Sequence, residues 1–338
     1  MPPFLKVTIR ANRFAGLFKQ PNCHPKIYKI RPAVCPNTTH TQQNAKTSLK
    51  ITALQYFCAI MHSMRLLLLV MGFSVTSVGF GQYYYNDLVV LRQTNSQYQA
   101  LRANHILLVN AKSFEGDGTP VADFVLQQQL VNNGAEVITT SKDPSAGSSV
   151  SDAFYENGLL KKSIDTGGSY VTNTVLYDYD ALGNVTTLTT LTSDTFMNSH
   201  SKEVHQWFYN NGSPLRMLRI KDDKDTAVVD FVKDEQGNVA EEHLTKNGRG
   251  VETYFYYYNQ QHQLTDVVRY NRATKKMLPD FLFDYDSNGK LAEYNQVLHA
   301  ASTHLTWHYE YNANGLKQAE TCYDKNKQLV GKIIYNYN

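Results

Sequence analysis

Acidic and amide side chains alternate in the segment DYDSNG, with the spacing that begins a calcium-binding loop. Asp284, Asp286 and Asn288 would supply the first oxygen ligands. Such a loop also needs an acid at its twelfth position, where this chain has the neutral Asn295. A sister segment earlier in the chain has Leu182 in place of the third ligand. We therefore expect no calcium site and interpret the segment as a turn between two strands.

Histidines and carboxylates elsewhere do not assemble a catalytic motif. His304 and His308 would share one face of a strand, but no third metal ligand accompanies them. The acid pairs at 234–235 and 241–242 would point to opposite faces of a strand, so we expect solvated charges there. Residues 83–338 contain no nucleophile elbow, phosphate loop or dinucleotide fingerprint. We expect a protein that is not an enzyme and holds no metal or cofactor.

Aromatic side chains offer a different chemistry, the stacking of sugar rings. Residues 254–258 read YFYYY, with aromatic side chains on both faces, which predicts a strand covered on both sides. Aromatic residues on strands more often form the core, where their burial stabilises the fold. If they are exposed, the candidate glycan-binding residues are Tyr254, Tyr256, Tyr258, Trp207 and Trp307. A glycan-binding protein or glycan hydrolase is therefore the alternative function.

The segments that carry these residues are copies of one pattern. YDYDALGNV begins at Tyr177 and FDYDSNGKL at Phe283, with more divergent copies from Phe231, Tyr256 and Tyr309 and shorter ones from Phe154 and Trp207. The turn acids or amides are spaced by 30, 24, 25, 27 and 26 residues, at Asp180, Asn210, Asp234, Asn259, Asp286 and Asn312. A drifting period of this length indicates an internal repeat.

Each repeat predicts one hairpin. The Asp or Asn side chain can accept hydrogen bonds from backbone N–H groups, and a glycine three residues on can adopt the positive φ of a type I turn with a G1 bulge. Alternation before the turn predicts a strand, and we expect Val185, Thr187, Thr189 and Leu191 to share one face after it. Aromatic residues mark the buried face, as at 305, 307, 309 and 311.

The expected fold is all-β. A lone hairpin is marginally stable in water, so the units must pair side by side. Residues 151–338 would form a repeat domain, in which a long antiparallel meander of hairpins makes a curled or wound sheet that encloses its aromatic face. Residues 83–150 would cap the first edge with one short helix at 88–103, strands at 105–114 and 121–131, a turn at 132–134 and a loop at 141–151.

Charge and cysteine content change sharply along the chain. Residues 1–60 carry nine of the 33 basic residues and no acid, which leaves 24 basic against 30 acidic residues in 61–338. That balance of −6 argues against a nucleic-acid partner. Only Cys322 follows residue 60, so no internal disulfide is expected in an exported protein.

Residues 61–82 have the layout of a secretory signal peptide. A short basic region, an apolar stretch at 66–73 and a small-residue stretch ending near Gly81 or Gln82 follow one another. We expect translation to start at Met64 or Met61, which makes residues 1–60 non-native upstream sequence without order. Two alternatives remain open, an organellar transit peptide and an uncleaved anchor at 54–81.

The pattern Y-x-Y-D-x-x-G-x-L resembles the YD repeat of RHS-type secreted bacterial proteins over residues 154–338, and its N-G-x-L variants resemble MORN-like repeats more weakly. The whole chain after the signal peptide looks like a group of exported Bacteroidota-type proteins with degenerate YD-like repeats. The resemblance implies a β shell, but the toxin domain and releasing core segment of RHS proteins are not visible here. We predict an exported, monomeric, non-enzymatic structural or binding module, periplasmic or extracellular, without a membrane span after cleavage. Its expected partner is an envelope protein or glycan.

Overall fold

The computed structural model describes residues 83–338, apart from 145–146, 169, 272–273 and 300–301. The predictions for residues 1–60 and 61–82 lie outside these described residues. The described chain is a long series of β-strands with one α-helix near its start. Among its helices, none combines the length and apolar character that crossing a membrane requires.

The elements follow one another with short connections. The helix α2 is Asn86–Ala103 and the 3-10 turn η1 is Asn132–Gly134. The first strands are β1 Leu108–Glu115, β2 Val125–Val131, β3 Glu136–Asp143, β4 Gly147–Glu156, β5 Leu159–Gly167, β6 Val171–Tyr179, β7 Val185–Asp194, β8 Ser199–Asn210 and β9 Ser213–Lys221. The later strands are β10 Asp225–Lys233, β11 Val239–Lys246, β12 Arg249–Tyr258, β13 Leu264–Asn271, β14 Lys276–Tyr285, β15 Leu291–Leu298, β16 Thr303–Tyr311, β17 Lys317–Asp324 and β18 Leu329–Tyr337.

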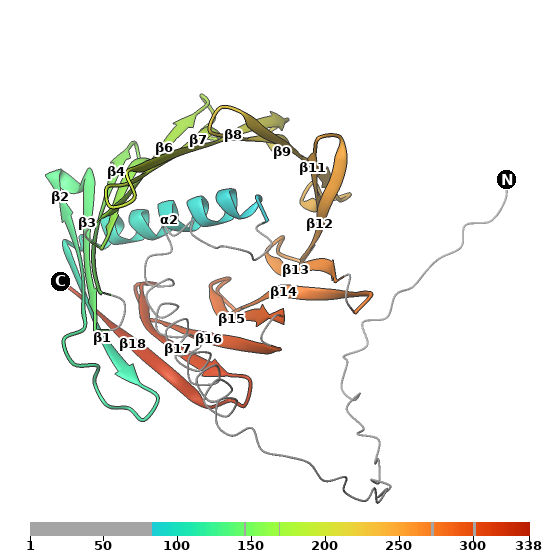
Figure 1. Cartoon of the computed structure of the whole chain (residues 1–338). Helices are drawn as coiled ribbons and strands as arrows, with labels where there is room; N and C mark the ends of the chain where they lie inside the picture. The colour runs from blue at the N-terminus through green and yellow to red at the C-terminus, as the bar shows by residue number, and fades with distance from the viewer. Residues whose placement is uncertain (1–82, 145–146, 169, 272–273, 300–301) are drawn as a thin grey trace, which may run out of the picture. The chain divides into compact units, whose positions relative to one another are not determined.

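The sheet closes on itself. Each strand pairs antiparallel with the next, and β1 pairs with both β2 and β18, so the 18-stranded sheet is a closed barrel (Figure 1). At the seam the register runs from Val109 opposite Tyr337 to Glu115 opposite Gly331. Closure leaves no unpaired strand edge. The predicted all-β antiparallel meander with one short helix is confirmed, and the strands of residues 83–150 belong to the same closed sheet.

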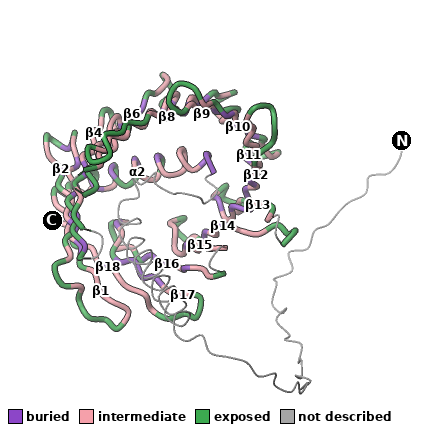
Figure 2. The backbone as a smooth tube through the Cα atoms, viewed as in Figure 1, coloured by how far each residue is buried: buried purple, intermediate pink, exposed green. Residues whose placement is uncertain are grey.

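The helix α2 lies inside the ring of strands (Figure 1). Leu91, Tyr98 and Leu101 on the helix are buried, and buried residues recur along the strands around it (Figure 2). Tyr98 stacks on Tyr155 with ring centroids 3.7 Å apart, and its hydroxyl donates to the carbonyl of Gly134 at 2.6 Å. The helix therefore contributes its buried face to the core that the strands enclose.

Five of the six predicted motif turns have the predicted geometry. At Asn210 the chain instead makes a two-residue turn at 211–212, where both residues have positive φ. In the first, the Gly183 amide donates to the Asp180 carbonyl at 3.1 Å, and Gly183 has a φ of 84°. The Asp180 side chain accepts from the amides of Leu182 and Asn184 at 2.9 and 2.8 Å. The same side-chain capping recurs at Asp234, Asn259, Asp286, Asn312 and Asp324. These turns are type I turns followed by a bulge.

The bulge changes which residues face inward after the turn. Val185 is buried opposite Tyr179, but the register then shifts by one residue, so Leu188 pairs with Tyr177 and is buried. The expected face of Val185, Thr187, Thr189 and Leu191 is therefore wrong beyond its first member, and Leu191 is exposed on the outer face. An extra residue on one strand reverses the alternation that follows it.

Two further expectations are corrected. Residues 141–151 are not a loop: β3 continues to Asp143, β4 begins at Gly147, and each bonds a strand on both sides. Ladder bonds here override the weak strand preference of Ser and Gly. The strand at 254–258 is not covered on both sides, because Tyr257 points outward and is 52% exposed.

The second aromatic of each motif makes one recurring bond. Its hydroxyl donates to a backbone carbonyl of the preceding hairpin, as Tyr285 does to Leu264 at 2.8 Å. The other tyrosines in this ladder are Tyr179, Tyr209, Tyr258, Tyr311 and Tyr337. At the equivalent place in the motif from Phe231, the Lys233 ammonium donates to the Asn210 carbonyl at 3.1 Å. The ladder ties each hairpin to its neighbour.

Candidate functional site on the inner wall

The structure places the predicted glycan-binding aromatics inside the ring. Tyr254, Tyr256, Trp207 and Trp307 are 1–4% exposed, and Tyr258 is partly buried. The Tyr83 ring, just before α2, packs 5.9 Å from the rings of Tyr254 and of Tyr256. Packed in this way, these side chains form core rather than a surface open to a ligand from outside.

The residues considered for metal binding are engaged in other contacts. The Asp286 carboxylate accepts from the amides of Asn288 and Lys290, both at 2.8 Å. His308 lies 3.4 Å from the Glu293 carboxylate and edge-on to a tyrosine ring. Over the described ranges, no three His, Cys, Asp or Glu side chains group closely enough to hold a metal ion.

An ionic network joins the start of α2 to the inner wall. His205 on β8 lies between two carboxylates, with Nδ1 2.5 Å from Asp87 on the helix and Nε2 3.0 Å from Glu203. Glu203 also pairs with Arg219 on β9 at 2.8 Å. His205 is 4% exposed, so this charge lies in the protein interior. Helix and wall are thereby connected by opposite charges.

Opposing effects set the ionisation of this network. Burial alone lowers the pKa of His205, but the charges of Asp87 and Glu203 and their hydrogen bonds outweigh it and raise the pKa to about 9. Burial opposes ionisation of Glu203, yet hydrogen bonds and charges from His205 and Arg219 lower its pKa to about 2. At neutral pH the imidazole is therefore a cation and no general base.

Glu242 holds the backbone at the start of the helix. Its carboxylate accepts from the amides of Tyr84 and Tyr85, both at 2.9 Å, and from the Tyr256 hydroxyl at 2.7 Å. Burial raises its pKa to about 7, although these hydrogen bonds oppose the rise. The expectation of a solvated charge is therefore wrong for Glu242. It shares the inward face with Tyr254, its cross-strand partner.

A second charged group joins β13 and β14 to Glu252 on β12 and to His299, just after β15. Arg269 Nε is 2.7 Å from the Asp280 carboxylate, and His299 Nε2 is 2.9 Å from the other oxygen of the same carboxylate. Glu252 lies 3.6 Å from Arg269. Burial raises the pKa of Asp280 despite its two cationic neighbours. Both groups pair opposite charges within the fold. Their role is therefore to hold neighbouring elements in position.

Sequence reasoning missed the His205 network and the buried state of Glu242, although a signal for them exists. Glu203, His205 and Trp207 alternate, so the two polar residues share the face of a buried aromatic. Glu242 and Tyr254 lie on separate motifs, and only their cross-strand pairing brings them together. Polar residues in phase with aromatic ones are the pattern that predicts a buried polar group.

Comparison with known proteins finds similar solved structures but identifies no family. No family model matches the sequence, and no curated protein matches it. A porin-like protein from Bacteroides uniformis is similar at 8% identity and TM-score 0.35, over 69% of this chain and 96% of that one. A porin-like protein from Bacteroides vulgatus is similar at 13% identity and TM-score 0.23, over 69% and 98%. The Photorhabdus luminescens Tc holotoxin pore is similar at 11% identity and TM-score 0.19, over 70% of this chain and only 17% of that one.

Proposed function

We propose that this protein is an exported, non-enzymatic β shell of the YD-repeat type that acts as a structural or binding module at the cell envelope. The observation that carries the proposal is the closed ring of repeated hairpins, whose aromatic face packs inward around α2. Its buried acids and histidine bind the helix and the wall, so they serve the fold.

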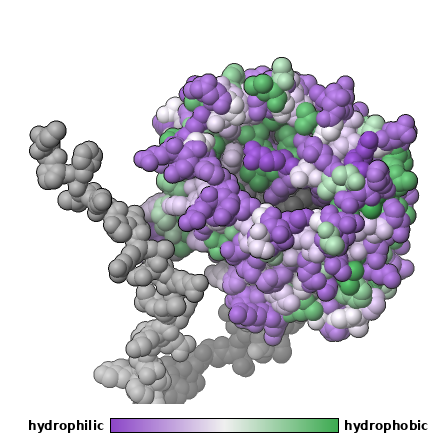
Figure 3. Space-filling view, turned by 180° about the vertical axis from the view of Figure 1, so that it is seen from behind, coloured by the Kyte–Doolittle hydropathy of each residue, from purple (hydrophilic) through white to green (hydrophobic). Residues whose placement is uncertain are grey.

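The outer wall supports an aqueous location. Hydrophilic residues dominate the surface seen in Figure 3. Outward positions on β9 and β10 carry Arg216 and Asp230, which pair at 2.6 Å and are each about half exposed. Charged side chains of this kind are stable in contact with water. This wall is compatible with our proposal of a monomer in the periplasm or outside the cell that faces an envelope protein or glycan.

Cell fractionation tests export. The full chain with a C-terminal tag should be recovered from the periplasm or medium of a Bacteroidota host, with its N-terminus near residue 82. Leu68→Arg is the matched control, because a charge in the apolar stretch should keep the protein in the cytosol. Recovery of the parent protein from the cytosol would contradict the proposal.

An activity assay tests the enzymatic alternative. The purified protein is incubated with cell-wall glycan, and newly formed reducing ends are counted against a heat-denatured sample. We expect no difference between the two samples, because the buried carboxylates on the inner wall are already paired. Release of reducing ends that is lost in Glu203→Gln would instead support a glycan hydrolase.

A further inference from the structure

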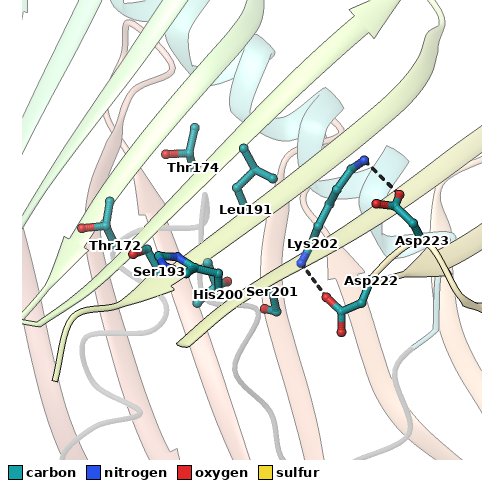
Figure 4. A pocket seen from close by; sticks show the side chains of 10 residues that line it. Thr172, Thr174, Leu191, Ser193, His200, Ser201, Lys202, Asp222 and Asp223 are labelled. Atoms are coloured by element: carbon teal, nitrogen blue, oxygen red, sulfur yellow. Dashed lines mark hydrogen bonds and ion pairs between the residues drawn. The ribbon is translucent and has the colours of Figure 1, made fainter. Parts of the chain in front are cut away.

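An open hollow lies on the outer face of β6, β7 and β8, away from the inner network (Figure 4). It has a volume of about 490 Å³. The hairpin between β9 and β10 leans over one side of it. There the Asp222 carboxylate accepts from the Lys202 amide, and Asp223 pairs with the Lys202 ammonium, each at 2.9 Å. The hollow is therefore lined by the ends of β6 and β7 that lie away from their motif turn at 180–183.

Strand register sets the lining of the hollow. Across β6 and β7, Thr172 stands opposite Ser193, and across β7 and β8 Ser193 stands opposite His200. One pair further along, Leu191 stands opposite Lys202 and is 40% exposed. The result is an apolar floor at Leu191 with hydroxyl, imidazole, ammonium and carboxylate groups around it (Figure 4).

These polar groups remain available to a ligand. Within the described residues, the Thr172 and Ser193 hydroxyls and the His200 ring have no hydrogen-bond partner. The inner-wall groups differ, because carboxylates and cations there are paired with one another. Hydroxyl and imidazole groups both donate and accept, and the carboxylates accept. The hollow therefore offers both halves of the hydrogen bonds that a polyhydroxylated molecule makes.

An exposed aromatic pair lies at the ends of β6 and β7, two of the strands that line the hollow. Tyr170 and Phe196 are 57% and 75% exposed, and their ring centroids lie 5.5 Å apart. Thr172 lines the hollow, and Tyr170 lies two residues before it, in the turn that precedes β6. The Thr195 amide donates to the Tyr170 carbonyl at 2.9 Å and fixes the pair at the ends of β6 and β7. Two large aromatic side chains exposed together mark a contact surface.

We propose that this hollow and the Tyr170–Phe196 pair bind a neutral oligosaccharide. The apolar faces of sugar rings pack on the aromatic pair and on Leu191, while sugar hydroxyls bond the polar lining. Two carboxylates against one ammonium disfavour an anionic ligand such as a nucleic acid or an acidic glycan. This site lies on the outside of the shell and is separate from the buried aromatics considered from the sequence.

The hairpin that carries the carboxylates has an unusual composition. Asp222 and Asp223 both have positive φ, at 50° and 55°. Three other hairpins with two positive φ values use Asn-Gly, at 157–158, 211–212 and 247–248. Glycine accepts this backbone without a Cβ clash, whereas Asp does so at a cost. The chain therefore retains two carboxylates at this hollow in place of the less strained pair.

Calorimetry with defined sugars tests the site. The full chain is titrated with hexamers of neutral glucan, chitin and xylan, and with a hyaluronan hexamer as the anionic probe. We expect at least one neutral hexamer to bind, and the hyaluronan hexamer to bind more weakly by about tenfold or more. Tyr170→Ala combined with Phe196→Ala should weaken neutral-sugar binding by about tenfold or more without lowering the melting temperature.

A matched variant separates this site from general stickiness. Phe208→Ala and Tyr257→Ala remove outer-wall aromatics of 45% and 52% exposure that do not line the hollow, and they should leave binding unchanged. No binding of any neutral hexamer overturns the proposal, as does binding that survives loss of Tyr170 and Phe196. Either result leaves the proposed function intact. That proposal depends on the closed ring with its inward aromatic face and is tested by export.

Discussion

At the scale of single residues, the motif assigns its two aromatics different tasks. The first, such as Phe283, is buried in the core, and the second, such as Tyr285, is half-buried and bonds the preceding hairpin. A carbonyl at the end of a strand pair would otherwise lack a partner. These two different roles explain why the two aromatic residues keep the same spacing in the repeats of this chain.

Tyr285→Phe should lower the free energy of unfolding by about 1 kcal/mol, because it removes one hydrogen bond and leaves the Leu264 carbonyl unsatisfied. Tyr257→Phe is the control, since the Tyr257 side chain is half exposed on the outer wall and should change stability little. Urea unfolding of both variants measures the difference. Equal effects in the two variants would mean that the ladder bond contributes nothing.

His205→Gln should weaken the attachment of α2 in a pH-dependent way. Folding raises the pKa of His205 from 6.5 to about 9, so its contribution is complete below pH 6.5 and is lost as pH rises through 9. We expect the variant to be less stable than the parent by about 2 kcal/mol near pH 6, and the difference to close at higher pH. Urea unfolding at several pH values measures it.

His243→Gln on the outer wall is the matched control, because His243 is 41% exposed in its side chain and does not contact α2. A loss in the His205 variant that is the same at every pH would contradict a charged imidazole. In the parent protein, stability should also fall as pH drops from 4.5 through about 2, because folding lowers the pKa of Glu203 over that range.

At the scale of elements, each hairpin depends on a backbone conformation that favours glycine. Gly237 has a φ of 88°, and a Cβ built on it would meet no atom within 4 Å. Glycine is therefore favoured at this position by the positive φ, and not by a lack of space for a side chain. In the Asn259 and Asp324 turns, His262 and Lys327 take the same place with φ values of 58° and 61°, so the fold tolerates a non-glycine residue there.

Gly237→Ala should destabilise the fold by about 1 kcal/mol, because a Cβ is strained at positive φ. Gly250→Ala is the control, since Gly250 lies in β12 without a positive φ and also has open space around it. That variant should be neutral or slightly stabilising, as replacement of a strand glycine reduces the entropy of the unfolded chain. A thermal unfolding scan compares the two variants, and equal melting temperatures would show that the turn is not strained.

At the scale of the whole sheet, closure between the first and last strands removes both edges. Leu108–Glu115 bonds strands from opposite ends of the described chain, β2 on one side and β18 on the other. Strand edges left open invite pairing with a second chain. The expectation of a monomer therefore depends on this seam.

Ala111→Pro should open the ring at the seam, because proline removes an amide donor from a strand that is bonded on both sides. We expect dimers or larger species, measured by light scattering during gel filtration. Ala111→Gly keeps the amide and is the control, which should remain a monomer. A monomeric proline variant with unchanged hydrogen exchange in β18 would show that the seam does not hold the ring.

Much of this architecture can be predicted from local sequence patterns. Alternating aromatic residues, turn acids and glycines predicted the hairpins, their antiparallel order and the enclosed aromatic face, because each depends on neighbours within one repeat. The reversal of alternation after Val185 also follows from the bulge. The loop expected at 141–151 was wrong because its strands are stabilised by partners on both sides, which composition does not reveal.

The sequence by itself determined the unit of construction, since turn chemistry and period-two alternation act over a few bonds. Only the tertiary structure decided what the units enclose and where the ends meet. Glu242 reaches Tyr84 across 158 positions of the chain, His205 reaches Asp87 across 118, and β1 bonds β18 at the far end of the described chain. Such contacts depend on how every hairpin twists against the next, and no single repeat contains that information.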